Sequence, residues 1–293
     1  MIEARILPAL HARLARAFAP PPVPLVPFDV DGFTVGELTV ERARRIAAFD
    51  DVFEIDERRV AFTATCRTAD DRTAAMARVA RTLASEGALS AWRDEHYDVR
   101  AGAGGPVAFL LERAAARYFG VRTTAVHVNG LVDDGGRAAM WIARRSPAKA
   151  IDPGMLDNLV GGGIAAGATV GETLVKEAWE EAGIDAALAS RAQPTGALRV
   201  RRMQPDGLQH ETIHVHDLWL PRAFSPANQD GEVVEHRLAP LAEVPALLAH
   251  DEPPDALTAD ASLVALSALI RLGAIDADNP LFPWLADLCG LGR

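Results

Sequence analysis

Residues 158 to 184 read NLVGGGIAAGATVGETLVKEAWEEAGI, which is a short apolar run, a glycine-rich stretch and a helix pattern. The run NLV predicts a strand that leads into a loop of three glycines. We predict a helix from about Gly171 to Ala182, because Thr169 suits an N-cap and Gly183 suits the left-handed residue that ends a helix. The stretch is therefore a strand, a loop and a helix that is fixed at both ends.

Three glutamates, Glu177, Glu180 and Glu181, share one edge of this helix near its C-terminal end. Like charges at this spacing cost a few tenths of a kcal/mol per pair, and this end of a helix favours cations. A solvated acidic face is one explanation. A magnesium site is the other, because Mg²⁺ takes hard oxygen ligands and bridges carboxylates to substrate phosphates. A bound cation would cancel the repulsion, but the three glutamates alone do not decide between the two explanations.

The spacing of the stretch resembles the signature of the Nudix hydrolases. That signature is Gly, five residues, Glu, seven residues, Arg, Glu, an apolar residue, any residue, Glu, Glu, any residue, Gly and an apolar residue, and it is intact from Gly162 to Ile184. The family's first Glu falls on Ala168 and its Arg on Lys176, which keeps the charge but lacks the planar fork. The resemblance implies metal ligands at the Gly161 carbonyl, Glu177, Glu180 and Glu181, and structural support from Gly162, Lys176 and Gly183.

The resemblance also implies a fold and a reaction. The expected fold class is α+β, an α/β/α sandwich with a mixed sheet, preceded by a small α/β N-terminal domain. A narrower resemblance, over about residues 28 to 273, is to the Nudix branch related to the domain that accompanies thiamin pyrophosphokinase in some fungi. It rests on four stretches together, AWRDEHY (91–97), WIARRSPAKAIDPGMLDNLVGGG (141–163), GLQHETIHVHDLWLP (207–221) and NQDGEVVEHRL (228–238). It implies Mg²⁺- or Mn²⁺-dependent hydrolysis of thiamin diphosphate, or of an oxidised analogue, to the monophosphate and phosphate.

The remaining chemical needs are a base and donors for the phosphate oxygens. Glu180 and Glu232 are both candidates for the base, and the pattern does not choose between them. Arg144, Arg145 and Lys149 lie between a predicted strand end and the glycine-rich stretch, and arginine forks suit bidentate phosphate binding. Since neighbouring residues of a strand point to opposite faces, at most one of Arg144 and Arg145 should reach the site.

Composition and charge exclude several classes of protein. The net charge is −10, from 40 acidic and 30 basic residues, so a general basic surface for nucleic acid is not expected. Cys66 and Cys289 fit no metal-ligand spacing and suit a reducing compartment, so we expect a cytoplasmic location. No apolar run approaches the ~18 residues of a membrane span. The expected partner is a small-molecule diphosphate, with a homodimer left open.

The chain divides at the glycine-rich break RAGAGGP, residues 100 to 106. We place an N-terminal helix, a proline-rich linker and a small α/β domain in residues 1–105, and the Nudix domain in residues 106–293. Trp92 and Tyr97 lie close to this junction, where they either wall the pocket around the non-phosphate part of the substrate or hold the domains together. The C-terminal helix that begins near Asp260 is not expected to take part in function.

Two other classes stay open beside the hydrolase. A Nudix-like binding module would typically have lost glutamates from the signature, and this sequence keeps them. Isopentenyl diphosphate isomerase, which has a related architecture, relies on a cysteine near the signature, and Cys66 and Cys289 are badly placed for that role. Another nucleoside or sugar diphosphate also remains open as the substrate of a hydrolase.

Overall fold

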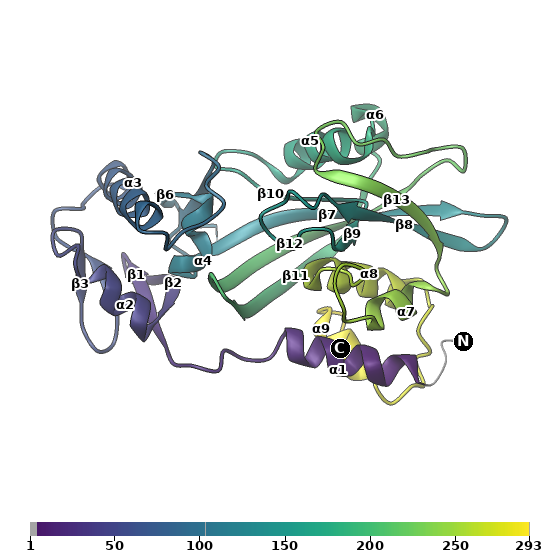
Figure 1. The fold of residues 1–293 in the computed structure, drawn as a ribbon, viewed down its shortest axis with the longest axis horizontal. Helices are drawn as coiled ribbons and strands as arrows, with labels where there is room; N and C mark the ends of the chain where they lie inside the picture. Colours follow the sequence, from purple (N-terminus) through teal and green to yellow (C-terminus); the bar gives the residue numbers. More distant parts are fainter. Residues whose placement is uncertain (1–4, 103, 293) are drawn as a thin grey trace.

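The computed structural model describes residues 5–102 and 104–292. An N-terminal unit with a small sheet lies beside a larger C-terminal unit built on long strands (Figure 1). One helix from the start of the chain lies below the long strands and is connected to the N-terminal unit by an extended segment.

The N-terminal unit is built around aromatic side chains. Phe28, Phe53, Phe62, Phe109 and Phe119 pack together, with ring centroids 5.2 to 6.2 Å apart, and such contacts add to the stabilisation from burial. Its first sheet has the order β2-β1-β4-β3, with strands β1 (Leu25–Val30), β2 (Phe33–Thr39), β3 (Phe53–Ile55) and β4 (Val60–Phe62). The other elements are α2 (Val40–Ile46), α3 (Ala69–Ser85) and the hairpin of β5 (His96–Arg100) and β6 (Val107–Glu112).

The two units meet after this hairpin. The glycine-rich break expected at residues 100–106 is the connection between β5 and β6, and the core of the N-terminal unit continues to Val121. The turn η1 (Arg113–Ala115) and α4 (Ala116–Phe119) follow. Gly120, at φ 57°, then leads into the long sheet, and a Cβ there would lie 2.1 Å from the Glu37 carbonyl oxygen. By its packing, the N-terminal unit therefore extends to about residue 121, not to residue 105.

The C-terminal unit contains a mixed sheet in the order β11-β12-β7-β8-β13, with β10 paired to β7 and β9 to β8. β7 and β12 run parallel, whereas the other pairs are antiparallel. The strands are β7 (Arg122–Asp133), β8 (Ala138–Arg145), β9 (Leu156–Asn158), β10 (Val160–Gly163), β11 (Gln193–Gln204), β12 (Gly207–Trp219) and β13 (Val233–Pro240). This is the expected mixed sheet.

Helices cover both faces of the sheet (Figure 1). One face carries α5 (Val170–Ala182) and α6 (Ala186–Ala189), and the other carries α1 (Ile6–Ala17), α7 (Val244–Ala249), α8 (Ala259–Arg271) and α9 (Phe282–Leu288). Leu7, Leu10 and Leu14 of α1 are buried in the same core as α8. The expected placement of this helix with the N-terminal domain is therefore wrong, because its apolar stripe packs against the C-terminal unit.

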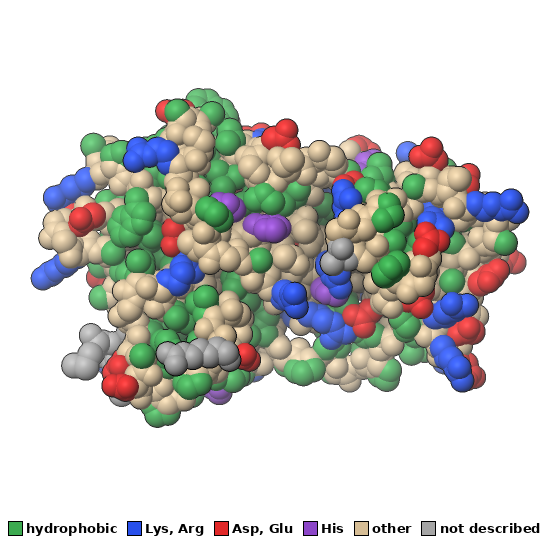
Figure 2. All heavy atoms as spheres, turned by 180° about the vertical axis from the view of Figure 1, so that it is seen from behind, with side chains coloured by type: hydrophobic (Ala, Val, Ile, Leu, Met, Phe, Trp, Pro, Cys, Tyr) green, Lys and Arg blue, Asp and Glu red, His purple; other side chains and the backbone are tan. Residues whose placement is uncertain are grey.

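The outer surface of the N-terminal unit carries acidic and basic side chains interspersed, as Figure 2 shows for the face behind Figure 1. Ion pairs such as Arg45 with Glu86 and Arg72 with Asp31 account for part of this pattern. That face of the unit therefore presents no broad field of one sign. Among the described helices, none combines the length and apolar character needed to cross a membrane.

Replacing Arg13 with alanine should destabilise the attachment of α1. The buried guanidinium donates to the Leu248 carbonyl and to Ser262 Oγ, both at 2.8 Å, and these acceptors would lose their partner. We expect a loss of ~2 kcal/mol or more, and a fall of roughly 4–8 °C in the thermal unfolding midpoint. Arg16→Ala is the control, because its exposed side chain pairs with Asp251 at the surface; it should shift the midpoint by less than ~2 °C. Equal shifts would contradict the assignment.

Candidate active site

Helix α5 is fixed at both ends, as predicted. The Thr169 hydroxyl accepts from the Glu172 amide at 3.2 Å, and the Glu172 carboxylate accepts from the Thr169 amide at 2.9 Å. At the other end Gly183 adopts φ 64°, and the Ile184 amide donates to the Ala178 carbonyl at 3.0 Å. These caps set the orientation of the glutamates that lie between them.

The three glycines before the helix belong to a strand. Gly161, Gly162 and Gly163 form the end of β10 and pair with β7, so the predicted loop of glycines is wrong. The close approach of α5 explains why glycine is needed: a Cβ on Gly162 would lie 2.4 Å from Glu177 Cδ. A Cβ on Gly161 would lie 2.8 Å from a ring carbon of His127. The glycines therefore make room for side chains that pack directly against the backbone of the strand.

Two of the predicted metal ligands lie against this strand. Glu181 is 5% exposed, and its carboxylate accepts a hydrogen bond from the Gly161 amide at 2.8 Å. Burial raises the pKa of Glu181 well above its ordinary value, although Lys149, 3.9 Å away, favours the charged form. Burial also raises the pKa of Glu177, against the opposing effect of Lys176.

The predicted supporting residue Lys176 neutralises the outer glutamates. Its ammonium donates to Glu177 at 3.1 Å and to Glu180 at 2.6 Å. Within residues 5–102 and 104–292, no three His, Cys, Asp or Glu side chains converge as a compact set of metal ligands. The donor chemistry nevertheless suits a hard cation, because carboxylate oxygens of Glu177 and Glu180 border a cleft and Gly162 leaves the space that Glu177 occupies.

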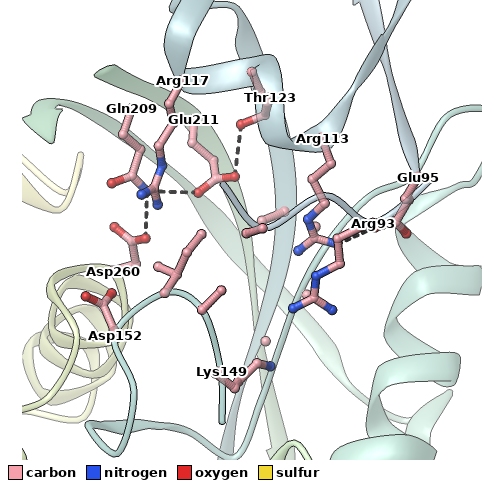
Figure 3. Close-up of a pocket in the computed structure, with 18 of the residues that line it drawn as sticks. Arg93, Glu95, Arg113, Arg117, Thr123, Lys149, Asp152, Gln209, Glu211 and Asp260 are labelled. Atoms are coloured by element: carbon pink, nitrogen blue, oxygen red, sulfur yellow. Dashed lines mark hydrogen bonds and ion pairs between the residues drawn. The ribbon is translucent and has the colours of Figure 1, made fainter. Parts of the chain in front are cut away.

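A cleft of about 270 Å³ connects this helix with the N-terminal unit. Thr123, Ala125 and His127 of β7 line it, because alternate residues of a strand face one side. From the N-terminal unit come Arg93, Glu95, Tyr97, Arg113 and Arg117, several of which point into the cleft in Figure 3. The sequence did not single out these arginines, since each looks like an ordinary surface charge.

One end of the cleft carries a group of cations around Glu232. Lys149 and Arg93 both bond to its carboxylate, Arg93 at 3.1 Å. Burial alone would raise the pKa of Glu232, but the bonds to Lys149 and Arg93 outweigh it and lower the pKa to about 2. Two cations from different units thus converge on one carboxylate beside α5.

The two candidate arginines at the end of β8 separate, as their alternation on the strand predicts. Arg145 lines the cleft and bonds to Asp157 at 2.7 Å. Arg144 bonds to Asp255 at 2.8 Å and to Glu235 at 3.0 Å, and it does not line the cleft. Arg144 therefore holds neighbouring loops, and Arg145 remains the candidate that faces a ligand.

The opposite end of the cleft is acidic, with Asp152, Glu211 and Asp260 among its lining residues (Figure 3). We expected the start of the C-terminal helix to lie outside the site. Its predicted position is wrong, because α8 places Asp260 in the wall of the cleft. The sequence contained a signal that pointed to Glu211. Gln209 and Glu211 lie on the same face of β12 as the buried Ile213 and Val215. Polar side chains on a buried face require hydrogen-bond partners, so their presence there marks a polar site.

The two aromatic residues near the junction differ in their surroundings. Tyr97 is 7% exposed and lines the cleft, and a Cβ on Gly163 would lie 2.3 Å from its hydroxyl oxygen. Trp92 is 37% exposed and donates to Asp94 at 2.7 Å. Only Tyr97 is thus placed to contact both the glycine strand and a ligand.

Comparisons with known proteins agree with this arrangement. A family model described as "Domain of unknown function (DUF4743)" matches residues 22–123, and one described as "NUDIX domain" matches residues 121–261. "Nudix hydrolase 20, chloroplastic" of Arabidopsis thaliana is 36% identical over 263 residues, covering 87% of this chain and 70% of that protein. The chain belongs to the Nudix hydrolase family.

Two further matches cover less of this chain. An uncharacterized protein of Saccharomyces cerevisiae is 31% identical over 248 residues, covering 79% of this chain and 71% of its own length. Among solved structures, a Deinococcus radiodurans protein covers 58% of this chain and 97% of its own, at 23% identity and a TM-score of 0.42. Membership of the family makes this protein a hydrolase whose C-terminal unit has the Nudix fold, in a family that cleaves diphosphate bonds with divalent metals.

Gly162→Ala should remove most hydrolytic activity without unfolding the Nudix unit. The added Cβ would displace the Glu177 carboxylate, and displaced charge stabilisation typically costs ~10²-fold in rate. Gly171→Ala is the matched control, because a Cβ there meets nothing within 4 Å. Phosphate release by the purified variants, with circular dichroism as the folding check, measures the difference. Full activity in Gly162→Ala would show that the close approach is not required.

Proposed function

We propose that this Nudix protein hydrolyses thiamin diphosphate, or an oxidised analogue of it, to the monophosphate and phosphate. The observation that carries the proposal is one cleft that joins the carboxylates of α5 to Lys149 and to Arg93 of the N-terminal unit. Cations there suit a diphosphate, and the length of the cleft beyond them leaves room for an organic group. The resemblance of residues 28 to 273 to the thiamin-related branch supports the choice of organic group.

Each residue of the signature has a proposed task. The Gly161 carbonyl and the carboxylates of Glu177, Glu180 and Glu181 would hold Mg²⁺ or Mn²⁺. When bound, such a cation neutralises the diphosphate oxygens and lowers the pKa of the attacking water. Lys176 is exposed, so its ammonium can leave the carboxylates as the cation arrives.

Lys149 and Arg93 are the proposed donors to the diphosphate. In the structure both bond to Glu232, which is itself an anion in the position where a phosphate could sit. Because these cations hold the pKa of Glu232 near 2, its carboxylate is a weak base while they remain in place. Lys176 likewise holds the Glu180 carboxylate at 2.6 Å, so Glu180 and Glu232 both stay proposed bases, and Glu232 also arranges the two cations. The cytoplasmic location stays a prediction, and so does the homodimeric assembly.

A panel of diphosphates tests the substrate. Thiamin diphosphate, oxidised thiamin diphosphate, ADP-ribose and a nucleoside diphosphate sugar should be offered with Mg²⁺, with phosphate and monophosphate products measured. We expect the highest kcat/KM for a thiamin compound. Preference for ADP-ribose or a sugar diphosphate would retain the hydrolase and overturn the substrate.

Glu180→Gln and Glu181→Gln should each reduce hydrolysis by ~10²-fold or more, since each keeps the side-chain shape and deletes a charge that positions the cation. Activity of the wild type should vanish in excess EDTA and return with Mg²⁺ or Mn²⁺. Glu57→Gln, in the exposed turn between β3 and β4, serves as the control and should retain activity within about a factor of three. Undiminished turnover in EDTA would contradict the metal assignment.

Lys149→Met should raise KM for a diphosphate substrate by about tenfold or more, because a partly buried ammonium that donates to an anion is lost. Arg137→Met, at the exposed tip of the β7–β8 hairpin, changes the net charge equally and should leave KM within about twofold. Steady-state kinetics on both variants decide the point. Equal effects would mean that Lys149 acts only through the general charge of the protein.

A further inference from the structure

One buried glutamate of the N-terminal unit fixes the backbone of two segments that border the cleft. Glu112 is 3% exposed, and its carboxylate accepts from the Arg93 amide at 3.1 Å and from the Ala114 amide at 3.3 Å. The first bond holds the segment that carries Arg93, and the second holds η1, which carries Arg113. The backbone positions of both arginines are therefore set by the same side chain.

Three contacts hold Arg113, yet part of its guanidinium is unused. Its amide donates to the Glu95 carbonyl at 2.8 Å, its Nη1 donates to the Glu95 carboxylate, and its guanidinium lies 5.6 Å from the centre of the Tyr97 ring. Within residues 5–102 and 104–292, Nε and Nη2 of Arg113 have no hydrogen-bond partner, and neither is a buried atom. Because the side chain extends into the cleft (Figure 3), these N–H groups are open to a ligand.

The same contacts place Arg113 beside the strand that carries the glycines of the signature. The Tyr97 hydroxyl lies so close to Gly163 that a Cβ there would be 2.3 Å from it, and Gly162 packs against Glu177 in the same way. Burial alone would lower the pKa of Arg113, but the groups around it, Tyr97 first and Glu177 among them, raise it. The guanidinium therefore lies at the same end of the cleft as the proposed metal ligands.

We propose that Arg113 binds the diphosphate through its Nε and Nη2 groups, so that the N-terminal unit supplies a phosphate-binding arginine to the site of the Nudix unit. The inference rests on the proposed diphosphate hydrolysis, to which it adds a binding residue. An arginine fork matches two oxygens of one phosphate. Since a cation held by α5 cannot contact every oxygen of a diphosphate, the remaining oxygens need N–H donors, and Arg113 offers two.

A comparison with Arg144 separates this role from a structural one. Nε, Nη1 and Nη2 of Arg144 all have acceptors in the protein, at Glu235, the Gly154 carbonyl and Asp255. That arginine has spent its donors on holding loops together. Arg113 spends only Nη1 in this way, and its contacts with the N-terminal unit orient the rest of the fork without satisfying it.

Titration with a diphosphate that resists hydrolysis tests Arg113 separately from turnover. Methylenediphosphonate has a carbon in place of the bridging oxygen, and calorimetry of the full chain with Mg²⁺ measures its binding without a reaction. Arg113→Met should weaken this binding by about tenfold or more, because two charge-assisted hydrogen bonds are lost. Arg113→Lys keeps the charge but lacks the fork, so it should still bind at least about threefold more weakly than the wild type.

Arg44→Met on α2 is the matched control, because it deletes the same charge from an exposed position of the same unit and should leave binding within about twofold. Circular dichroism checks the fold of each variant, and Arg113→Lys decides the point if Arg113→Met does not fold. Weaker binding in the Arg113 variants, with no hydrolysis of any diphosphate in the panel, would support the role of Arg113 and overturn the proposed reaction. The proposal itself is overturned if the wild type does not bind, if Arg113→Lys binds as the wild type does, or if Arg44→Met shows an equal loss.

Discussion

The close approach of α5 to β10 is the constraint on which the site depends. A helix that carries three glutamates on one edge would ordinarily turn them to water, yet Glu181 is 5% exposed and bonds to the Gly161 amide. Glu177 also lies against the strand, and it can do so because Gly162 has no Cβ, which would lie 2.4 Å from Glu177 Cδ. Gly162 thus provides space for a carboxylate, whereas Gly183 provides the left-handed conformation that ends the helix.

Other contacts compensate for the two departures from the family signature. Lys176 replaces the usual arginine and reaches both Glu177 and Glu180, so charge neutralisation survives without the planar fork. Ala168 replaces the first glutamate in a loop that other bonds fix. The Ala166 amide donates to the His96 carbonyl of β5 at 2.7 Å, and Thr169 caps the helix that follows. The N-terminal unit therefore supports the signature loop as well as lining the cleft.

The sequence predicted well those features that depend on local spacing. The caps of α5 at Thr169 and Gly183 follow from residue type at fixed offsets, and the separation of Arg144 from Arg145 follows from strand alternation. Features set by tertiary contacts were not accessible. The partner of α1 and the junction near Val121 depend on which apolar faces meet, and local patterns do not specify that. The position of Asp260 could not be predicted for the same reason, because the packing of α8 on the sheet brings this residue to the site.

Strand β7 relates the two ends of the cleft to each other. Glu211 pairs with Thr123 near the start of β7, whereas Gly161 pairs with His127 four residues later. At ~3.3 Å per residue, these positions are roughly 13 Å apart along the strand. Because both positions lie on one continuous strand, the fold sets the distance between the Glu211 end of the cleft and the glutamates of α5.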